Sequence, residues 1–238
     1  MRATPGSCPD AMSCAAVIFD FDGVIADSEV RANMSLSESL TAIGMPATYD
    51  ECLRDYYGHN WQETQRRIEA RFGRPLPADF REQHRERARG RFMEGFDAVP
   101  GAADFLATLG PLPRAIASSS RAEYIGWAPG LFGLDHHFGE HIYSADGWDR
   151  GKPHPDIYLA AARGPGVDPA HCLAIEDSPA GAQAALAAGM TVVGFCGAGH
   201  IVDRAAHGDM LREVGVHRVA FTFAGISIAA EAGTVAAG

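Results

Sequence analysis

The sequence has 238 residues, of which 47% are hydrophobic and 21% are charged, and it carries a formal net charge of −10. A chain of this length and composition can bury a full hydrophobic core, either as one domain or as one domain with an insertion. The acidic balance argues against nucleic acid or an anionic membrane surface as a partner, although a locally positive pocket can still accept an anionic substrate.

Both ends of the chain are expected to be flexible. Residues 1–13 contain no apolar segment of the kind that a signal peptide requires, and residues 231–238 are rich in alanine and glycine. No run approaches the roughly 18 apolar residues of a membrane span. The five cysteines are odd in number and form no C-x-x-C pair, so we expect reduced thiols in a cytoplasmic protein.

The first predicted strand covers residues 15–19 and runs directly into Asp20 and Asp22. Two carboxylates this close repel each other, and each loses hydration when it is buried, so a cation or hydrogen-bond donors must compensate. Gly23 follows and permits a sharp turn of the backbone. The pair of aspartates therefore needs partners from elsewhere in the chain.

The next segment, from about residue 29 to residue 98, contains no convincing strand. Its apolar residues recur with helical spacing, Gly44 and Gly73 are typical helix ends, and a Val-Pro-Gly turn at 99–101 closes the segment. We expect a helical insertion placed directly after the first strand. The predicted helices cover residues 28–43, 49–57, 61–72 and 78–94.

Short apolar runs that suit buried strands return after the insertion, with helical stretches between most of them. In one such stretch Ser178 can cap a helix, Pro179 can take its first position and Gly189 can end it. Alternation of strand and helix predicts the α/β class, a doubly wound parallel sheet with helices on both faces. The predicted strands cover residues 114–117, 172–175, 191–195 and 218–221.

Polar side chains follow three of the predicted strands at the point where each strand ends. The carboxyl ends of parallel strands open on one edge of the sheet, where ligands of such folds bind, so these side chains are expected to gather there. They are Asp20 and Asp22 after the first strand, Ser118, Ser119 and Ser120 after the second, Glu176 and Asp177 after the third, and Lys152 in a stiff Gly-Lys-Pro-His-Pro stretch before the third.

This collection of side chains predicts phosphoryl chemistry. Several carboxylates cannot all stay ionised together without a cation, and hard oxygen ligands favour Mg²⁺. A metal ion, a lysine and hydroxyl donors suit a phosphoryl group, whose transfer depends on positioning and charge stabilisation. An aspartate can attack phosphorus to give an aspartyl-phosphate, and a second carboxyl two residues along can protonate the leaving oxygen and later deprotonate water.

Four stretches resemble the motifs of the haloacid dehalogenase superfamily, in its phosphatase and phosphomutase branch. DFDGVIADSE resembles the first motif, AIASSS the second, GKPHPDIY the third and AIEDSPAGAQAALAAGM the fourth, in matching order and spacing. The four motifs span residues 15–195. The resemblance implies a Rossmann-like catalytic core of residues 14–28 and 99–230, and a helical cap of residues 29–98 that closes over the core and selects the substrate.

The resemblance also implies the catalytic roles. Asp20 would be the nucleophile and a metal ligand, and Asp22 would be the general acid/base, with its main-chain carbonyl on the metal. Ser118 would hold the transferring phosphoryl group. Lys152 would neutralise charge on the phosphate and on Asp20.

The metal and phosphate contacts follow from the same motifs. Asp177 would complete the Mg²⁺ site, and Glu176 would bind the ion directly or support another ligand. Gly23 would let the backbone turn next to the phosphate, and Ser119 is expected to contact the substrate.

A loop of the cap, residues 56–61, matches the place where relatives contact the leaving group of the substrate. Gly58 would allow close approach there, and His59, Asn60 and Trp61 would supply polar and stacking contacts. A helix–helix turn with Trp61 buried is an equal alternative. Three arginines, Arg81, Arg85 and Arg89, recur along one helix face, where they are either solvated or offer one guanidinium to a second anionic group of the substrate.

Within the family, the acid/base candidate Asp22 and the pair Glu176 and Asp177 argue against a true dehalogenase. In similar phosphomutases a histidine gates the acid/base aspartate, and Ala32 stands at the matching position. The FCGAGH stretch at 195–200 resembles phosphatases of sugar phosphates and phosphosugar acids.

We therefore expect a Mg²⁺-dependent phosphatase for a small phosphorylated metabolite, working as a monomer or small homo-oligomer. A sugar phosphomutase of the β-phosphoglucomutase type is the alternative. A non-catalytic phospho-acceptor module is disfavoured, because it has no use for Asp22 or for a lid.

Overall fold

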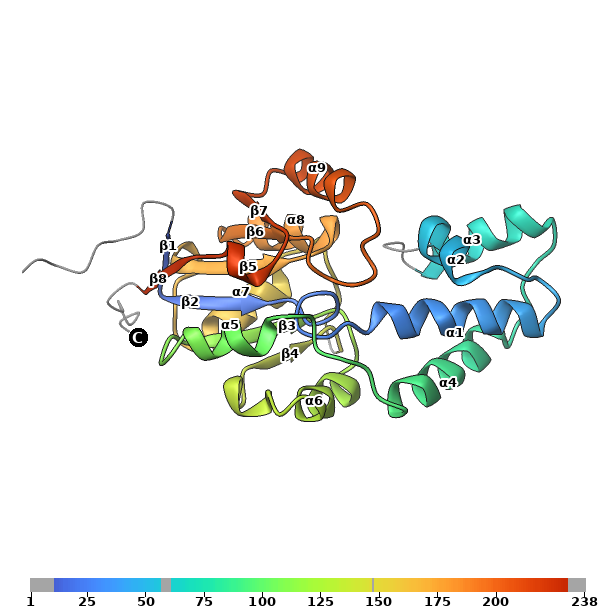
Figure 1. The fold of residues 1–238 in the computed structure, drawn as a ribbon, viewed down its shortest axis with the longest axis horizontal. Coiled ribbons are helices and arrows are strands. Elements are labelled where there is room, and N and C mark those ends of the chain that lie inside the picture. The colour runs from blue at the N-terminus through green and yellow to red at the C-terminus, as the bar shows by residue number, and fades with distance from the viewer. Residues whose placement is uncertain (1–10, 57–60, 147, 231–238) are drawn as a thin grey trace, which may run out of the picture. The chain divides into compact units, whose positions relative to one another are not determined.

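A computed structural model describes residues 11–56, 61–146 and 148–230 (Figure 1). These residues form two compact units. The core unit joins the residues up to Asp27 with those from Ala98 onward, and the helical unit comprises Ser28–Asp97. The chain therefore leaves the core unit once and returns to it once.

A parallel sheet of six strands forms the centre of the core unit, in the order β4-β3-β2-β5-β6-β7. The strands β2, β3 and β5 are buried along their whole length, since they are mostly apolar and helices cover the sheet. The α/β class with a doubly wound parallel sheet is confirmed. The strands are β2 (Ala16–Phe19), β3 (Arg114–Ser118), β4 (Ile142–Ser144), β5 (Cys172–Glu176), β6 (Thr191–Phe195) and β7 (Arg218–Ala220).

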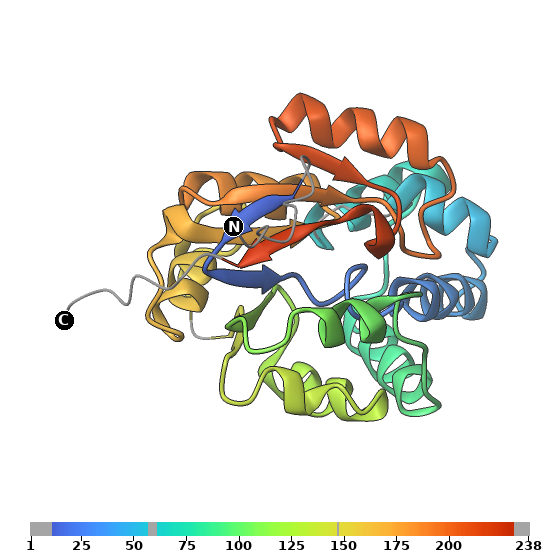
Figure 2. The ribbon, with the colours of Figure 1, turned by 60° about the vertical axis from the view of Figure 1, so that its left-hand side comes forward.

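The helices between the strands cover both faces of the sheet. From β2 the chain steps outward to β3 and β4, and from β5 it steps the other way to β6 and β7. Right-handed crossovers therefore put the helices of the two halves on opposite faces. Helix α6 packs beside the edge strand β4, and Figure 2 shows α9, in orange-red, beside the edge strand β7. The helices of the core unit are α5 (Ala102–Thr108), α6 (Ala122–Leu131), α7 (Asp156–Arg163), α8 (Pro179–Ala187) and α9 (Arg204–Val214), with short 3₁₀ turns η1 (Asp135–His137), η2 (Pro169–His171) and η3 (Phe223–Gly225).

Helix α8 begins and ends as its sequence predicts. The hydroxyl of Ser178 accepts a hydrogen bond from the N–H of Gly181 at 3.1 Å, and Pro179 takes the first helical position. Gly189 follows the helix with φ of 85°, a conformation that costs glycine little. The loop before α8 is therefore fixed at its junction with β5.

A second, two-stranded sheet joins residues near the two ends of the described chain. The strand β1 (Met12–Cys14) pairs in parallel with β8 (Ile228–Ala230). The sequence had suggested that residues through Ser13 are loose, but Met12 and Ser13 belong to this pair. A pair of three-residue strands is defined by its main-chain hydrogen bonds, and the sequence shows no alternating apolar pattern that would predict it.

The helical unit contains α1 (Glu29–Ala42), α2 (Tyr49–Tyr56), α3 (Trp61–Phe72) and α4 (Phe80–Met93), and no strand among its described residues. These bounds match the predicted helices within about two residues. A small apolar core holds the helices together, and its largest buried members are Leu40, Met45, Tyr56, Ile68 and Phe80. None of the helices that the structure describes, in either unit, has the length and hydrophobicity needed to cross a bilayer.

The points where the chain leaves and re-enters the core unit lie side by side. Ala26 and Ala98 form an antiparallel bridge, and the N–H of Val99 donates to the carbonyl of Ile25 at 2.9 Å. The four cysteines among the described residues are buried, and none of them forms a disulfide with another described residue.

Candidate active site

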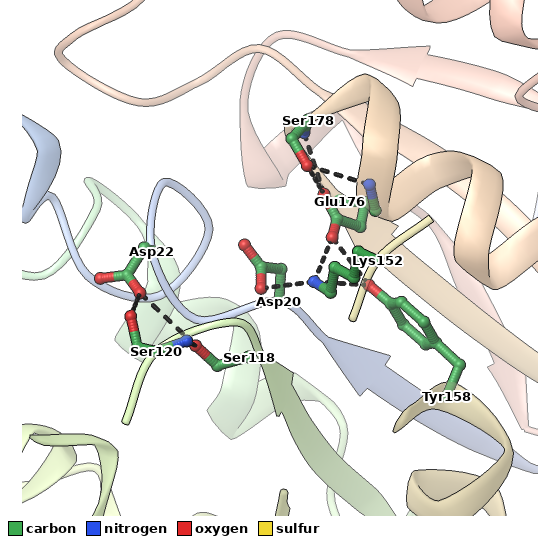
Figure 3. A network of polar contacts seen from close by, with 9 residues as sticks. Asp20, Asp22, Ser118, Ser120, Lys152, Tyr158, Glu176 and Ser178 are labelled. Atoms are coloured by element: carbon green, nitrogen blue, oxygen red, sulfur yellow. Dashed lines mark hydrogen bonds and ion pairs between the residues drawn. The ribbon is translucent and has the colours of Figure 1, made fainter. Parts of the chain in front are cut away.

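Three neighbouring strands deliver the predicted side chains to one edge of the sheet. Asp20 follows β2 directly, Ser118 is the last residue of β3 and Glu176 is the last residue of β5. Since β2 lies between β3 and β5, these ends are adjacent. Figure 3 shows the side chains of Asp20, Lys152 and Glu176 directed toward one another.

Lys152 is buried between two carboxylates. Its Nζ lies 2.8 Å from Oδ1 of Asp20, forms an ion pair with Glu176 and lies 3.3 Å from the hydroxyl of Tyr158. Tyr158 in turn donates to Oε1 of Glu176 at 2.9 Å. Burial opposes the charge of Lys152, but the carboxylates of Asp20 and Glu176 outweigh it and hold the pKa of Lys152 above its ordinary value. The lysine is therefore a fixed cation at the edge of the sheet.

Asp20 is placed where a negative charge is costly. Burial raises the pKa of Asp20 to about 8, with Glu176 and Asp22 adding to the rise and Lys152 opposing it. The ammonium group of Lys152 thus offsets only part of the cost of burial. A further positive charge at this edge would favour the anionic form of Asp20.

The acidic side chains fit a divalent ion. Asp20, Glu176 and Asp177 are all buried, and each offers an oxygen within 4.8 Å of the others. Opposite ligands of Mg²⁺, at bonds of about 2.1 Å, are about 4.2 Å apart, so only a small adjustment is required. Three buried carboxylates against one lysine also leave negative charge for a cation to balance. The donor set is therefore one that Mg²⁺ prefers.

Glycines let the backbone pass close to these carboxylates. Gly23 has φ of 81°, and a Cβ at this position would collide with Oδ2 of Asp177. A Cβ at Gly181 would collide with the carboxylate of Glu176, whose Oε2 accepts bonds from the N–H and the hydroxyl of Ser178 at 2.9 and 3.0 Å. The sequence predicts that Gly23 lets the backbone turn next to the phosphate. The structure shows a second reason for a glycine here, which is the close approach of Asp177.

The carboxylate of Asp22 is held by hydroxyl groups and not by the lysine. Ser120 donates to Oδ2 of Asp22 at 2.6 Å, Tyr124 donates to Oδ1 at 3.1 Å, and Oγ of Ser118 lies 3.5 Å from Oδ2. In Figure 3 the Asp22 carboxylate points away from Asp20, toward Ser120. The two aspartates of the first motif therefore occupy separate polar environments. Ser119, the remaining serine of the second motif, is exposed.

Several polar residues at this edge were not assigned from the sequence. Tyr158 follows Lys152 within the third motif, so the motif could have suggested it, whereas Tyr124 is a residue of α6 that reaches Asp22 only through tertiary structure. His207 and His200, which contact Asp177, come 23 or more residues after it in the chain, and of these two only His200 lies in a stretch, 195–200, that resembles a family sequence. Their contacts depend on tertiary structure and leave no local pattern.

In the helical unit, Trp61 is a packing residue. Its ring stacks on Phe80 and on His84, with ring centroids 6.1 and 5.9 Å apart, and the guanidinium of Arg81 lies 5.7 Å from its ring centroid. These contacts favour the alternative in which Trp61 joins the core of the unit. The other three residues predicted for this loop, Gly58, His59 and Asn60, lie outside the described residues.

Three relatives resemble this chain over most of their length. The protein YhcW of Bacillus subtilis is 35% identical over 184 residues, which cover 75% of this chain and 81% of YhcW. Hexitol phosphatase A of Escherichia coli is 31% identical, with 76% of this chain and 83% of that protein covered. The 6-phosphogluconate phosphatase of Escherichia coli is 27% identical, with 78% and 84% covered.

Solved structures agree with the fold. A haloacid dehalogenase-like protein of Agrobacterium tumefaciens has 33% identity and a TM-score of 0.80, with 88% of this chain and 94% of that chain covered. A hydrolase of Deinococcus radiodurans, solved with bound phosphate and sodium, has 33% identity and a TM-score of 0.76, with 89% and 92% covered. Residues 14–189 of this chain match the haloacid dehalogenase-like hydrolase family.

Proposed function

Since this chain belongs to the haloacid dehalogenase-like hydrolases, we propose that it is a Mg²⁺-dependent phosphatase that hydrolyses a small phosphomonoester through Asp20. The observation that carries the proposal is the setting of Asp20. Its carboxylate lies 2.8 Å from Nζ of Lys152 and shares a compact acidic group with Glu176 and Asp177. A nucleophile, a fixed cation and a set of metal ligands thus coincide at one carboxylate.

In the first half-reaction, an oxygen of Asp20 attacks phosphorus and the bond from phosphorus to the substrate oxygen breaks, which leaves an aspartyl-phosphate. Asp22, in its protonated form, gives its proton to the departing oxygen. The Nζ of Lys152 and the hydroxyl of Ser118 stabilise negative charge on the phosphoryl oxygens. Mg²⁺, bound by Asp20, Asp177, the main-chain carbonyl of Asp22 and Glu176 or its partners, would neutralise charge and orient the phosphoryl group.

In the second half-reaction, the Asp22 carboxylate takes a proton from water as that water attacks phosphorus, and the bond from phosphorus to Asp20 breaks. Phosphate leaves and Asp20 is regenerated. For either step Asp22 must turn from Ser120 and Tyr124 toward the phosphoryl group, so these hydroxyls define the resting position of the acid/base.

The proposed substrate class is a sugar phosphate or a phosphosugar acid. Support comes from relatives named for 6-phosphogluconate and for hexitol phosphates, and from the FCGAGH stretch. Ala32, at the position of the gating histidine in phosphomutases, favours hydrolysis over isomerisation. The helical unit is proposed to act as the cap, and the enzyme is proposed to work in the cytoplasm, as the reduced thiols suggest.

The test is a panel of phosphorylated metabolites, assayed for phosphate release with MgCl₂ and with EDTA. The panel includes 6-phosphogluconate, hexitol phosphates, fructose 1-phosphate and p-nitrophenyl phosphate. We expect release with Mg²⁺, none with EDTA and none from the Asp20→Asn variant. Conversion of β-glucose 1-phosphate to the 6-phosphate, with a bisphosphate primer and little free phosphate, would instead identify a mutase. No turnover on any substrate would contradict the proposal.

A further inference from the structure

His200 is a buried imidazole that lies between two carboxylates. Only 1% of the residue is exposed. Its Nε2 lies 3.5 Å from Oδ2 of Asp177, and its Nδ1 lies 4.0 Å from Oδ1 of Asp27. One ring therefore lies between a predicted metal ligand and Asp27, the last residue of the core unit before the chain enters the helical unit.

The surroundings of His200 restrict how its ring can lie. The N–H of Gly199 donates to both carboxylate oxygens of Asp27, at 3.2 Å each, and a Cβ at Gly199 would collide with that carboxylate. On the other side, a Cβ at Gly23 would lie 3.1 Å from Cε1 of the His200 ring. The loop after β6 and the loop after β2 thus enclose the imidazole.

Asp177 is held in two independent ways. His207, in the first turn of α9, places its Nε2 2.5 Å from the main-chain carbonyl of Asp177. His200 faces the side chain instead. A carboxylate that ligates a metal needs a fixed orientation, and partners that hold the ligand often matter almost as much as the ligand itself.

We propose that His200 is a positioning residue of the metal site, which orients the Asp177 carboxylate for a divalent cation, and that the Asp27 carboxylate, 4.0 Å from Nδ1, favours this orientation of the His200 ring. This inference rests on the proposed function, because it assigns Asp177 to a metal site. If His200 only filled space, its substitution would change the stability of the fold but not the affinity of the protein for Mg²⁺.

The experiment measures the binding of MgCl₂ alone to the full chain, by titration calorimetry and by the Mg²⁺-dependent rise in melting temperature. For His200→Ala we expect the Kd for Mg²⁺ to rise about 10- to 100-fold. In His200→Gln the amide can still donate to Asp177, and we expect it to recover part of that loss. At saturating Mg²⁺ the kcat of both variants should fall far less than the Kd rises.

His217→Ala is the matched control. Its Nδ1 accepts the N–H of Val192 at 3.0 Å, near the opposite end of β6 from the site. The variant loses a histidine and a hydrogen bond from the same sheet, so its melting temperature should fall while its Kd for Mg²⁺ stays unchanged.

Asp27→Asn tests the second half of the inference. We expect a smaller rise in Kd than for His200→Ala, and no further rise when Asp27→Asn is added to His200→Ala, because both act through one ring. If His200→Ala does not fold, His200→Gln and Asp27→Asn are compared alone. An unchanged Kd in folded His200 variants would overturn the inference. Failure of the parent chain to bind Mg²⁺ would instead contradict the proposed function.

Discussion

The core unit buries charged side chains at one edge of its sheet, whereas the helical unit keeps its charged side chains near the surface. Asp20, Glu176 and Asp177 are at most 7% exposed. In the helical unit, Arg71 pairs with Glu51 and Asp55 while each of the three side chains stays about 30% exposed. Among the described residues, every buried carboxylate belongs to the core unit.

This difference in burial distinguishes charged side chains of the candidate active site from charged side chains that only keep the surface hydrated. A buried ion costs free energy, and an apolar residue of similar size would often give a more stable protein. Exposed ion pairs cost and contribute little. Burial of several like charges is therefore a better indication of a functional site than the number of charges, since the helical unit is richer in arginine and yet shows no comparable cluster among its described residues.

The largest effect is expected at the centre of the buried group. Asp20→Asn removes the nucleophile but keeps its shape, so phosphate release should fall on the order of 10⁴-fold or more. Circular dichroism should be unchanged, because the substitution removes a desolvated carboxyl and keeps its volume. Turnover near the parent level in this variant would mean that another residue attacks phosphorus.

Lys152→Met and Arg71→Met compare a buried cation with an exposed one. Without Mg²⁺, loss of Lys152 leaves buried carboxylates unpaired, and we expect the free energy of unfolding to fall by about 3–5 kcal/mol. Arg71→Met should cost about 0–1 kcal/mol. Phosphate release should fall about 10²–10³-fold in Lys152→Met and remain unchanged in Arg71→Met. Urea titration measures the free energy of unfolding, and the phosphate assay measures turnover. Equal losses of stability in the two variants would mean that the buried and the exposed cation contribute alike.

The raised pKa of Asp20 predicts how pH affects the metal-free protein. Folded Asp20 keeps its proton up to about pH 8, whereas the unfolded chain loses it near pH 4. The folded state therefore binds more protons between these values, and the contribution of Asp20 to stability falls as pH rises through this window. Urea titrations at several pH values give the free energy of unfolding of the parent and of Asp20→Asn. Between pH 4 and pH 8 this free energy should fall more steeply with rising pH in the parent than in the variant.

The same proton competes with the metal ion. Up to about pH 8, the affinity for MgCl₂ should rise by at most about tenfold per pH unit, since one proton leaves Asp20 for each ion bound. Calorimetry in buffers of different ionisation enthalpy would count the released proton. An affinity that does not change between pH 6 and pH 8 would contradict the raised pKa of Asp20 and mean that its carboxyl is already ionised without the metal.

The smallest effects are expected on the exposed arginine stripe. Arg81, Arg85 and Arg89 are exposed, and each substitution by glutamine should change kcat/KM by less than about twofold if they are solvated. A rise in KM of more than about tenfold for 6-phosphogluconate, with p-nitrophenyl phosphate unaffected, would show that one guanidinium recognises a second anionic group.

The sequence was sufficient for the elements that carry strong local patterns. The buried strands β2, β3, β5 and β6 are apolar runs, and the polar residues that follow three of them could be placed at one edge from topology alone. The edge strand β4 was missed because Ile142–Ser144 is three residues long and half-buried. It needs the neighbouring β3 to become a strand.

Contacts between distant segments could not be predicted in this way. The hydroxyl of Tyr124 reaches Asp22 across 102 residues of sequence, and His207 reaches Asp177 across 30. Trp61 was ambiguous for a different reason, since an indole near the start of a helix can either pack in the core or contact a substrate. The rings of Phe80 and His84 that stack on it favour packing. Tertiary packing, and not propensity, supplies this information.

The bridge between Ala26 and Ala98 bears on how such enzymes diversify. This bridge holds the two ends of the helical unit together. The length of the roughly 70 residues between them therefore does not affect the distance between the strands on either side. Evolution, or an engineer with a short glycine linker, could therefore exchange or delete that whole block without disturbing the register of the strands.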